Sequence, residues 1–315
     1  MTGTGTQNDP YIVYTWIEFS NAIITPDVYV KLGADLDLNE GTEIIQEYLR
    51  NSQSIFTLRC KSVDGDGHRL SNIYNSQSGQ NGAYIFEAAY LSPGFEIKNL
   101  IFDNMILRGY RVMLFHGTVP SPGMYLTNCV FAGRLEQTGD YNGSGNSIYS
   151  FFSDESTYIR FDRCTFSLEA FMKEVYPLFG AHEIVANSQI KLSLTCRRQR
   201  TELLQNGAML QNAVMTNSYM TAEIKSEASA ADSNFLFSYG TFFSTFYFTA
   251  GFSNISNVSI NGGFANTCFY DAERAGETAI TNNASNSSYC HALTTAQCKD
   301  ADYLRSIGYA CEGGN

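Results

Sequence analysis

The chain has 315 residues and a formal net charge of −11, and its charged residues make up only 16% of the sequence. This acidic balance argues against nucleic acid as a partner, because phosphate binding needs a basic face. Aromatic residues make up 14% of the chain, which excludes a disordered tail. No stretch approaches the roughly 18 uninterrupted apolar residues of a transmembrane helix, so we expect no membrane insertion.

Residues 1–10 are polar and rich in Gly and Thr, without the basic start and apolar run of a signal peptide. We expect a flexible lead-in without a leader, followed by a strand at Tyr11–Val13. Thr15 and Glu18 have the spacing of a capping box, which predicts a short amphipathic helix at Trp16–Ile24. Its apolar face combines Trp16 or Ile17 with Phe19, Ala22 and Ile23, and it is expected to cover the N-terminal end of the fold.

Further strands are predicted at Tyr29–Leu32, Leu36–Leu38 and Phe56–Cys60, with a short helix at Glu43–Arg50. The run Asp64-Gly65-Asp66-Gly67 resembles part of a calcium loop. The later ligand positions of an EF-hand hold His68, Arg69 and Asn75 instead. We therefore predict a tight turn in which Gly supplies a positive φ.

A short pattern recurs about six times between Tyr84 and Phe264. Each copy has an apolar group and then a polar turn and a second apolar strand. The apolar groups end at Phe86, Phe115, Phe152, Phe179, Leu210 and Phe237, with steps of 29, 37, 27, 31 and 27 residues. The second strands are Ile97–Phe102, Leu126–Phe131, Phe161–Phe166, Ile190–Cys196, Met215–Ile224 and Ile255–Ile260.

Repeats of this length, without helical periodicity, predict an all-β parallel solenoid in which units stack about 4.8 Å apart. Irregular steps are expected where one loop takes an insertion, and the Gly-rich Glu136–Ser147 is the clearest case. The predicted division is 1–50 for the lead-in and cap, 51–270 for the solenoid and 271–315 for a C-terminal cap or tail. A terminal helix is predicted at Thr295–Ser306, ending at Gly308.

Eight cysteines show no metal-ligand spacing. Cys129, Cys164 and Cys196 lie at similar places in successive repeats, which predicts a column of buried thiols that Cys60 and Cys268 would extend. For Cys290, Cys298 and Cys311 the sequence leaves disulfide formation open.

The segment Phe235–Phe252 is unusually aromatic, and alternation cannot place all of its rings inside a narrow fold. Three interpretations stay open: contact between subunits or proteins, packing in a wide core, and stacking on carbohydrate. The segment and the Gly-rich insertion supply the candidate partner or ligand residues, which are Phe242, Phe243, Phe246, Tyr247, Phe248, Asp140, Tyr141 and Asn142.

Paired carboxylates on an exposed face would indicate a glycosidase. The candidates are Asp140, Asp154, Glu155, Asp162 and Glu169, but acidic residues do not recur at equivalent repeat positions. A Gly-x-Ser-x-Gly elbow, a P-loop, a dinucleotide fingerprint and a His-Glu-x-x-His motif are all absent. We therefore predict a protein without catalytic residues, cofactor or metal.

Several motifs resemble those of right-handed parallel β-helix proteins, found among bacterial surface proteins with GLUG repeats and bacteriophage virion proteins. They are Gly3–Val13, the Thr15–Phe19 helix start, Leu32–Leu38, Asp64–Ile73 and, at the C-terminal end, Leu293–Ala301 with Tyr303–Tyr309. Pro177–Gly180 resembles the apolar-Gly element of the repeat, and Asn128–Phe131 its Asn-Cys strand. The resemblance implies a single-stranded right-handed parallel β-helix with short capping helices at both ends.

The resemblance also implies a function. We expect a non-enzymatic structural part of a phage virion, such as a head fibre, decoration protein or tail appendage, made in the host cytoplasm. Its expected partners are other virion proteins, further copies of itself in a homotrimer, and host cell-surface glycan. The alternatives are a bacterial surface adhesin and a polysaccharide depolymerase.

Overall fold

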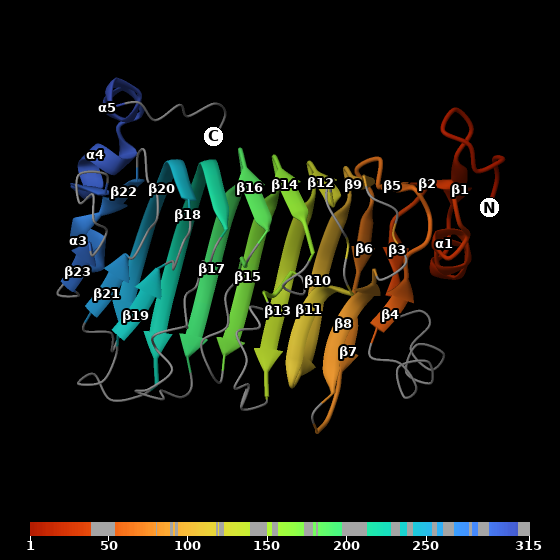
Figure 1. Ribbon diagram of the computed structural model, residues 1–315, viewed down its shortest axis with the longest axis horizontal. Helices are drawn as coiled ribbons and strands as arrows, with labels where there is room; N and C mark the ends of the chain where they lie inside the picture. Colours follow the sequence, from red (N-terminus) through yellow and green to blue (C-terminus); the bar gives the residue numbers. More distant parts are fainter. Residues whose placement is uncertain are drawn as a thin grey trace.

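The structure is a computed structural model in which the strands follow one another in a row along the longest axis (Figure 1). It describes residues 1–38, 54–79, 81–88, 91, 94–117, 119, 123–138, 150–152, 157–172, 179–180, 182–196, 213–227, 234–237, 242–253, 257–260, 268–276, 279–282 and 290–307. The predicted helix at Glu43–Arg50 lies outside these residues. Helix α1 (Trp16–Ile23) lies at one end of the row, and α4 (Thr295–Lys299) and α5 (Ala301–Ser306) lie at the other.

The strands form ladders, each a series of parallel strands paired side by side. The first ladder takes β1 (Tyr11–Val13), β2 (Tyr29–Leu32), β5 (Ser62–Asp64), β9 (Phe95–Lys98), β12 (Met124–Thr127), β14 (Ile159–Asp162) and β16 (Glu183–Ala186). It continues into the first residues of β18 (Val214–Ser226) and β20 (Phe242–Ser253).

The second ladder starts at β3 (Leu36–Asp37), β6 (Arg69–Ser71) and β7 (Tyr74–Ser76). It continues through β10 (Ile101–Gly109), β13 (Val130–Gln137), β15 (Thr165–Met172), β17 (Gln189–Cys196), the later parts of β18 and β20, β22 (Cys268–Asp271) and β24 (Cys290–Leu293). Two further groups are β4 (Ser54–Thr57), β8 (Gly82–Glu87) and β11 (Arg111–His116), and β19 (Asn234–Phe237), β21 (Asn257–Ile260) and β23 (Ala279–Asn282). Every pairing between these named strands is parallel. The described residues lie mainly in strands, and the helices are few and short, which confirms the all-β prediction.

The repeat predicted from the apolar groups is confirmed for its first four copies and is wrong for the last, because the predicted second strand Ile255–Ile260 falls in β21, which pairs with the apolar group of β19. Phe86 and Phe115 are register partners with ring centroids 5.4 Å apart, and Phe152 stacks on Phe179 at 5.0 Å. The backbone N–H of Phe115 donates to the carbonyl of Phe152, which joins the two pairs across the longest step. Leu210 lies outside the described residues. Equal positions in successive repeats therefore become neighbours in space.

Inward-facing positions of the second ladder form the centre of the core. Phe102, Phe131 and Phe166 are register partners and fully buried, with stacked rings 5.0 and 5.1 Å apart. Ile190 and Met220 continue the same column. Alternation along each strand places the intervening residues outside, as the burial pattern of β15 shows.

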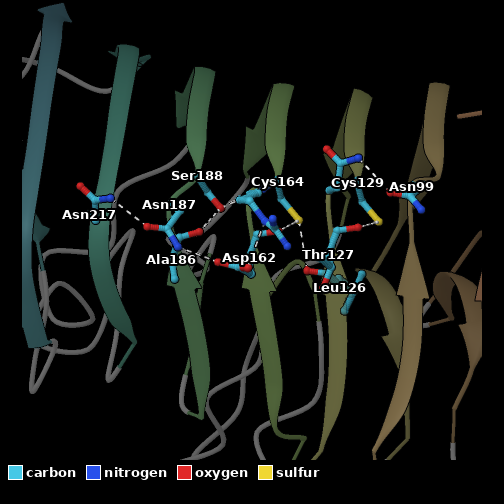
Figure 2. A network of polar contacts seen from close by, with 12 residues as sticks. Asn99, Leu126, Thr127, Cys129, Asp162, Cys164, Ala186, Asn187, Ser188 and Asn217 are labelled. Carbon is cyan, nitrogen blue, oxygen red and sulfur yellow. Dashed lines mark hydrogen bonds and ion pairs between the residues drawn. The ribbon is translucent and has the colours of Figure 1, made fainter. Parts of the chain in front are cut away.

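A corner joins the first ladder to the second, and one residue there has a positive φ in each repeat. These residues are Asn99, Asn128, Arg163, Asn187 and Asn217, with φ between 44° and 54°. Asn tolerates this left-handed conformation better than other residues with a Cβ. The side-chain amides also bond along the row: Asn128 donates to Asn99 at 2.9 Å, and Asn217 to Asn187 at 2.8 Å (Figure 2).

Arg163 interrupts this amide row, so its replacement is informative. Asn187 lacks an amide neighbour there and donates instead to Asp162, at 2.7 Å. We expect Arg163→Asn to raise the free energy of unfolding by about 1 kcal/mol, because Asn relieves backbone strain and extends the row. The ion pair of Arg163 with Asp162 is exposed and contributes little. Urea unfolding of Arg163→Asn and Arg163→Ala measures this; an Asn variant no more stable than the Ala variant contradicts it.

The residue after each corner confirms the predicted thiol column in part. Cys129 and Cys164 are buried neighbours, because Val130 and Thr165 are register partners. The next two positions hold Ser188 and Ser218, so the inclusion of Cys196 was wrong. Cys196 ends β17 opposite Met172 and Ser226. Cys268 does lie in the column by register, and Cys290 is its partner on β24.

Cys60 is buried outside this column, before β5, and burial raises the pKa of its thiol to about 12. A thiol ionises near pH 9 in the unfolded chain, so the folded state holds the extra proton between about pH 9 and 12. Stability is therefore fully present below pH 9 and falls above it by about 1.4 kcal/mol per pH unit. We expect the stability difference between wild type and Cys60→Ala to shrink by that slope between pH 9 and 11. Denaturant unfolding at a series of pH values measures it, and a constant difference contradicts it.

The N-terminal segment covers the open end of the strands, as expected for a cap. Phe19, Ala22 and Ile23 of α1 are buried, Trp16 packs partly buried against the core, and Ile17 is exposed. Trp16 rather than Ile17 therefore belongs to the apolar face. Thr15 caps the helix as predicted, whereas the Glu18 carboxylate accepts from the N–H of Tyr14 at 2.8 Å, one residue before the expected donor.

Residues 1–10 differ from the flexible lead-in that their composition predicted. The backbone of Thr2 exchanges two hydrogen bonds with Ile12 of β1, and Tyr29 donates to the carbonyl of Gly5. Gly3 has a φ of +88°, and a Cβ there would lie 2.0 Å from the carbonyl oxygen of Pro10. The glycines thus let the segment fold back closely, and Thr2 satisfies the edge of the first strand.

The Asp64–Gly67 run is a turn, as predicted. Asp66 and Gly67 both have positive φ. Lys98 and Lys31 lie beside the carboxylates of Asp64 and Asp66, at 3.7 and 2.9 Å. Two lysines therefore occupy the surroundings that a calcium ion would need.

Candidate functional site: the outer face at the C-terminal end

The predicted aromatic segment Phe235–Phe252 forms β19 and most of β20, and β20 pairs in register with β18. Phe243, Phe246 and Phe248 are partners of the buried Met215, Ser218 and Met220. Phe242 and Tyr247 are partners of the partly exposed Val214 and Tyr219. Three of these five candidate positions thus pair with buried residues of β18, and two pair with partly exposed ones.

The outer face beside β20 carries a second, separate apolar cluster. Phe269, Leu293 and Leu304 are its buried members, and Tyr219, Cys298, Tyr303 and Ile307 pack against them. Phe269 is the outward neighbour of Tyr270, which packs against the main core. We call these seven residues the outer cluster. It joins β18, β22 and β24 to the two terminal helices.

The terminal helices differ from the single helix predicted at Thr295–Ser306. Asp300 has extended backbone (φ −93°, ψ 100°) and ends α4, while its side chain caps α5 through the N–H groups of Asp302 and Tyr303. A side chain that bonds the next backbone amides favours a new helix start over continuation. The prediction of one continuous helix was therefore wrong. Both helices belong to the outer cluster through Cys298 and Leu304.

A buried carboxylate, Asp271, organises the surroundings of the outer cluster. It caps α3 (Ala272–Ala275) by accepting from the N–H of Arg274, at 3.0 Å. Its two oxygens also lie 2.9 and 3.0 Å from the hydroxyl of Thr295, which donates to them. Glu273 accepts from the backbone N–H of Thr295, at 2.9 Å. One acidic position therefore fixes both α3 and the start of α4.

Arg274 ties α3 to the outer face of the strands. Its guanidinium forms an ion pair with Glu223 of β18 and donates to the hydroxyl of Thr249 on β20, at 3.3 Å. Glu223 in turn lies over Gly251, where a Cβ would approach its carboxylate to 2.4 Å. The sequence offered no signal for this contact, because 51 residues separate Arg274 from Glu223.

The predicted carboxylates do not form a pair within the described residues. Asp162 is engaged by Asn187 and Arg163 at the corner. Glu169 is exposed on β15, between register partners Arg134 and Ser193. The next acid in its row is Glu223, two strands away at about 10 Å. Asp154, Glu155 and the insertion residues Asp140, Tyr141 and Asn142 lie outside the described residues.

Ion pairs also cover the outer face near the N-terminal end. Arg69 contacts Asp35 and Asp103, and His68 contacts Asp35 at 3.1 Å. The backbone N–H of Arg69, followed by the imidazole of His68, lowers the pKa of Asp35.

Within the described residues, no three His, Cys, Asp or Glu side chains gather closely enough to hold a metal ion. None of the described helices is long and apolar enough to span a membrane.

Comparison with known proteins finds a likeness in fold only. No family model and no curated protein matches the chain. A crystal structure of a "putative immunoglobulin A1 protease" from Bacteroides ovatus is similar with a TM-score of 0.52 at 12% identity, over 98% of this chain and 90% of that one. An "IgA1 Protease" structure gives a TM-score of 0.49 at 11% identity, over 87% of this chain and 21% of that one. The chain thus shares its fold over nearly its whole length with a bacterial protein of similar size.

Proposed function

We propose that the chain winds as a single-stranded right-handed parallel β-helix and serves as a non-enzymatic structural component of a phage virion. The order of strand pairing supports the winding. β8, β9 and β10 pair with β11, β12 and β13 respectively, so three successive strands meet the next three in the same order. A chain that returns to the same place once per repeat gives this order, and parallel neighbours need such crossovers.

The engagement of the surface charges supports a structural role. Asp162, Glu223 and the acids near Arg69 each have a cationic or amide partner, and the register partners of Glu169 on the two neighbouring strands are Arg134 and Ser193 rather than acids. An inverting or retaining glycosidase needs two acids within about 5–9.5 Å. A stacked, ion-paired surface with an aromatic segment at one end fits a head fibre, decoration protein or tail appendage that contacts other virion proteins.

A bacterial surface adhesin is the second candidate. The observation that favours it is the likeness in fold to the chain of Bacteroides ovatus, which extends over nearly the full length of both proteins. Such a protein would display the same stack on a cell and use its outer face for attachment to glycan or protein.

Antibody labelling separates the two candidates. An antibody raised against this chain is applied to purified phage particles from the source strain and, separately, to intact phage-free cells. Labelling of particles, with the chain among the peptides of the purified virion, supports the virion role. Labelling of phage-free cells replaces it with the adhesin, and labelling of neither contradicts both.

Catalysis is tested directly. Purified protein is incubated with host capsule polysaccharide and with immunoglobulin A1, beside the variants Asp154→Ala, Asp162→Ala, Glu169→Gln and Glu223→Gln. We expect no sugar release and no cleaved heavy chain with any form. Turnover by wild type that one of these variants abolishes overturns the non-enzymatic proposal and identifies the acid responsible.

The homotrimer is tested by light scattering coupled to size-exclusion chromatography. We expect a mass of three chains of 35.0 kDa each. A strict monomer at micromolar concentration contradicts the trimer and leaves the aromatic positions of β20 without a subunit partner.

A further inference from the structure

We propose that the C-terminal segment Thr294–Ile307 is a clasp that opens from the outer face as a unit while the parallel strands stay paired. In the closed state, which the structure shows, Leu304 of the clasp is buried in one cluster with Phe269, and Tyr219 packs against that cluster. Opening uncovers Phe269, whose register partner on β20 is Tyr247. This property belongs to the fold and holds whether or not the chain is part of a virion.

The clasp is packed separately from the ladders of paired parallel strands, which we call the stack. Its one buried side chain is Leu304, which belongs to the outer cluster with Phe269 and Leu293. The main core is far larger and includes no residue of the clasp. Regions with few buried apolar contacts open at lower free energy than the core, and they do so as cooperative units. The clasp can therefore open without loss of the core.

The helices of the clasp cannot hold themselves together. α4 has 5 residues and α5 has 6, far below the roughly 12–15 residues at which an isolated helix becomes even marginally stable. Their order depends on the outer cluster and on the contacts of Thr295 with Asp271 and Glu273. Losing these few contacts releases both helices together.

Asp271 sits on the boundary between the clasp and the stack. It ends β22, which pairs with β20 and β24, and it also caps α3. The Thr295 hydroxyl adds to that cap and is not needed for it. Opening of the clasp thus leaves α3 capped and Arg274 in contact with Glu223 and Thr249. The boundary between the clasp that opens and the strands that stay paired therefore lies at Thr294.

Thiol labelling of the intact chain tests the opening of the clasp, because the chain has one cysteine in the clasp and others among the paired strands. Cys298 lies partly buried in the outer cluster, while Cys129 and Cys164 are buried in the main core, and none of the three is in a disulfide. Alkylation with iodoacetamide is followed peptide by peptide by mass spectrometry. We expect Leu304→Ala to accelerate labelling of Cys298 at least about tenfold and to leave Cys129 and Cys164 unchanged.

The matched control is Arg305→Ala, which changes the neighbouring exposed residue and should leave all three rates unchanged. Hydrogen exchange gives a second measurement, since the amides of Cys298, Leu304 and Ile307 are bonded within the clasp. They should exchange faster in Leu304→Ala than in wild type while amides of β15 and β17 do not. Equal acceleration of Cys298 and Cys129, or no acceleration of either, overturns the proposal.

Discussion

Replacing Phe131 with Ala is expected to lower the free energy of unfolding by about 3–5 kcal/mol, the range for deletion of a buried aromatic ring. Phe131 is fully buried and stacks on Phe102 and Phe166 on the two neighbouring strands. It also meets the rings of Phe152 and Phe161 edge to face, at 5.8 and 6.0 Å. A cavity at this position would remove contacts in three successive repeats at once.

The neighbour Val130 supplies the matched control for this experiment. It lies on the same strand but faces outward and is only partly buried. We expect Val130→Ala to cost less than about 1 kcal/mol, and Phe131→Leu to fall between the two Ala variants. Urea unfolding followed by circular dichroism measures all three. A Phe131→Ala variant within 1 kcal/mol of wild type would show that the Phe column is not the centre of the core.

The regular part of this fold could be predicted because its information is local and repeated. The step from Phe86 to Phe115 in the sequence is the register of β8 with β11. Asn128 before Cys129 likewise marks a corner that needs a positive φ. In both cases one type of residue recurs once per repeat because the fold needs it there. Phe supplies a ring for the core, and Asn tolerates the left-handed backbone at the corner.

The thiol column shows why residue identity alone can mislead. Cys129 donates to the carbonyl of Thr127, two residues back, at 3.4 Å. Ser188 and Ser218 make the same bond to Ala186 and Thr216, at 2.6 and 2.8 Å. The column selects a small side chain that can donate to this carbonyl, and Ser meets that requirement as well as Cys. A search for cysteines therefore selected Cys196, which lies elsewhere, and missed both serines.

The outer face at the C-terminal end could not be predicted, because it depends on contacts between distant segments. Arg274 meets Glu223, and Thr295 meets Asp271, without any pattern at the intervening spacing. The aromatic content of Phe235–Phe252 marked this end of the chain as unusual. It did not indicate that the chain itself covers the adjacent Phe269. Sequence periodicity reports the face of a residue but not what covers that face.

Replacing Glu183 with Ala is expected to cost about 3–5 kcal/mol, comparable to the loss of a core ring, because its carboxylate is fully buried. One oxygen accepts from the hydroxyl of Ser150, and the other accepts from the backbone N–H of Gly180 at 2.9 Å. The Ser150 oxygen in turn accepts from the N–H of Phe152, at 3.0 Å. Glu183 thus joins its own strand to the two segments that carry Phe152 and Phe179, whose rings stack on each other.

Truncation removes the acceptor of the Ser150 hydroxyl and of the Gly180 N–H, at about 1–3 kcal/mol for each buried donor. Glu183→Gln keeps one acceptor oxygen and should lose about half as much, whereas Glu169→Ala on the exposed face should change stability by less than about 0.5 kcal/mol. Urea unfolding at pH 7 gives all three values. If the carboxylate acts as a buried acceptor, the loss of unfolding free energy is largest for Glu183→Ala, smaller for Glu183→Gln and smallest for Glu169→Ala. Equal losses for Glu183→Ala and Glu183→Gln would mean that the negative charge itself, rather than its hydrogen bonds, holds these segments together.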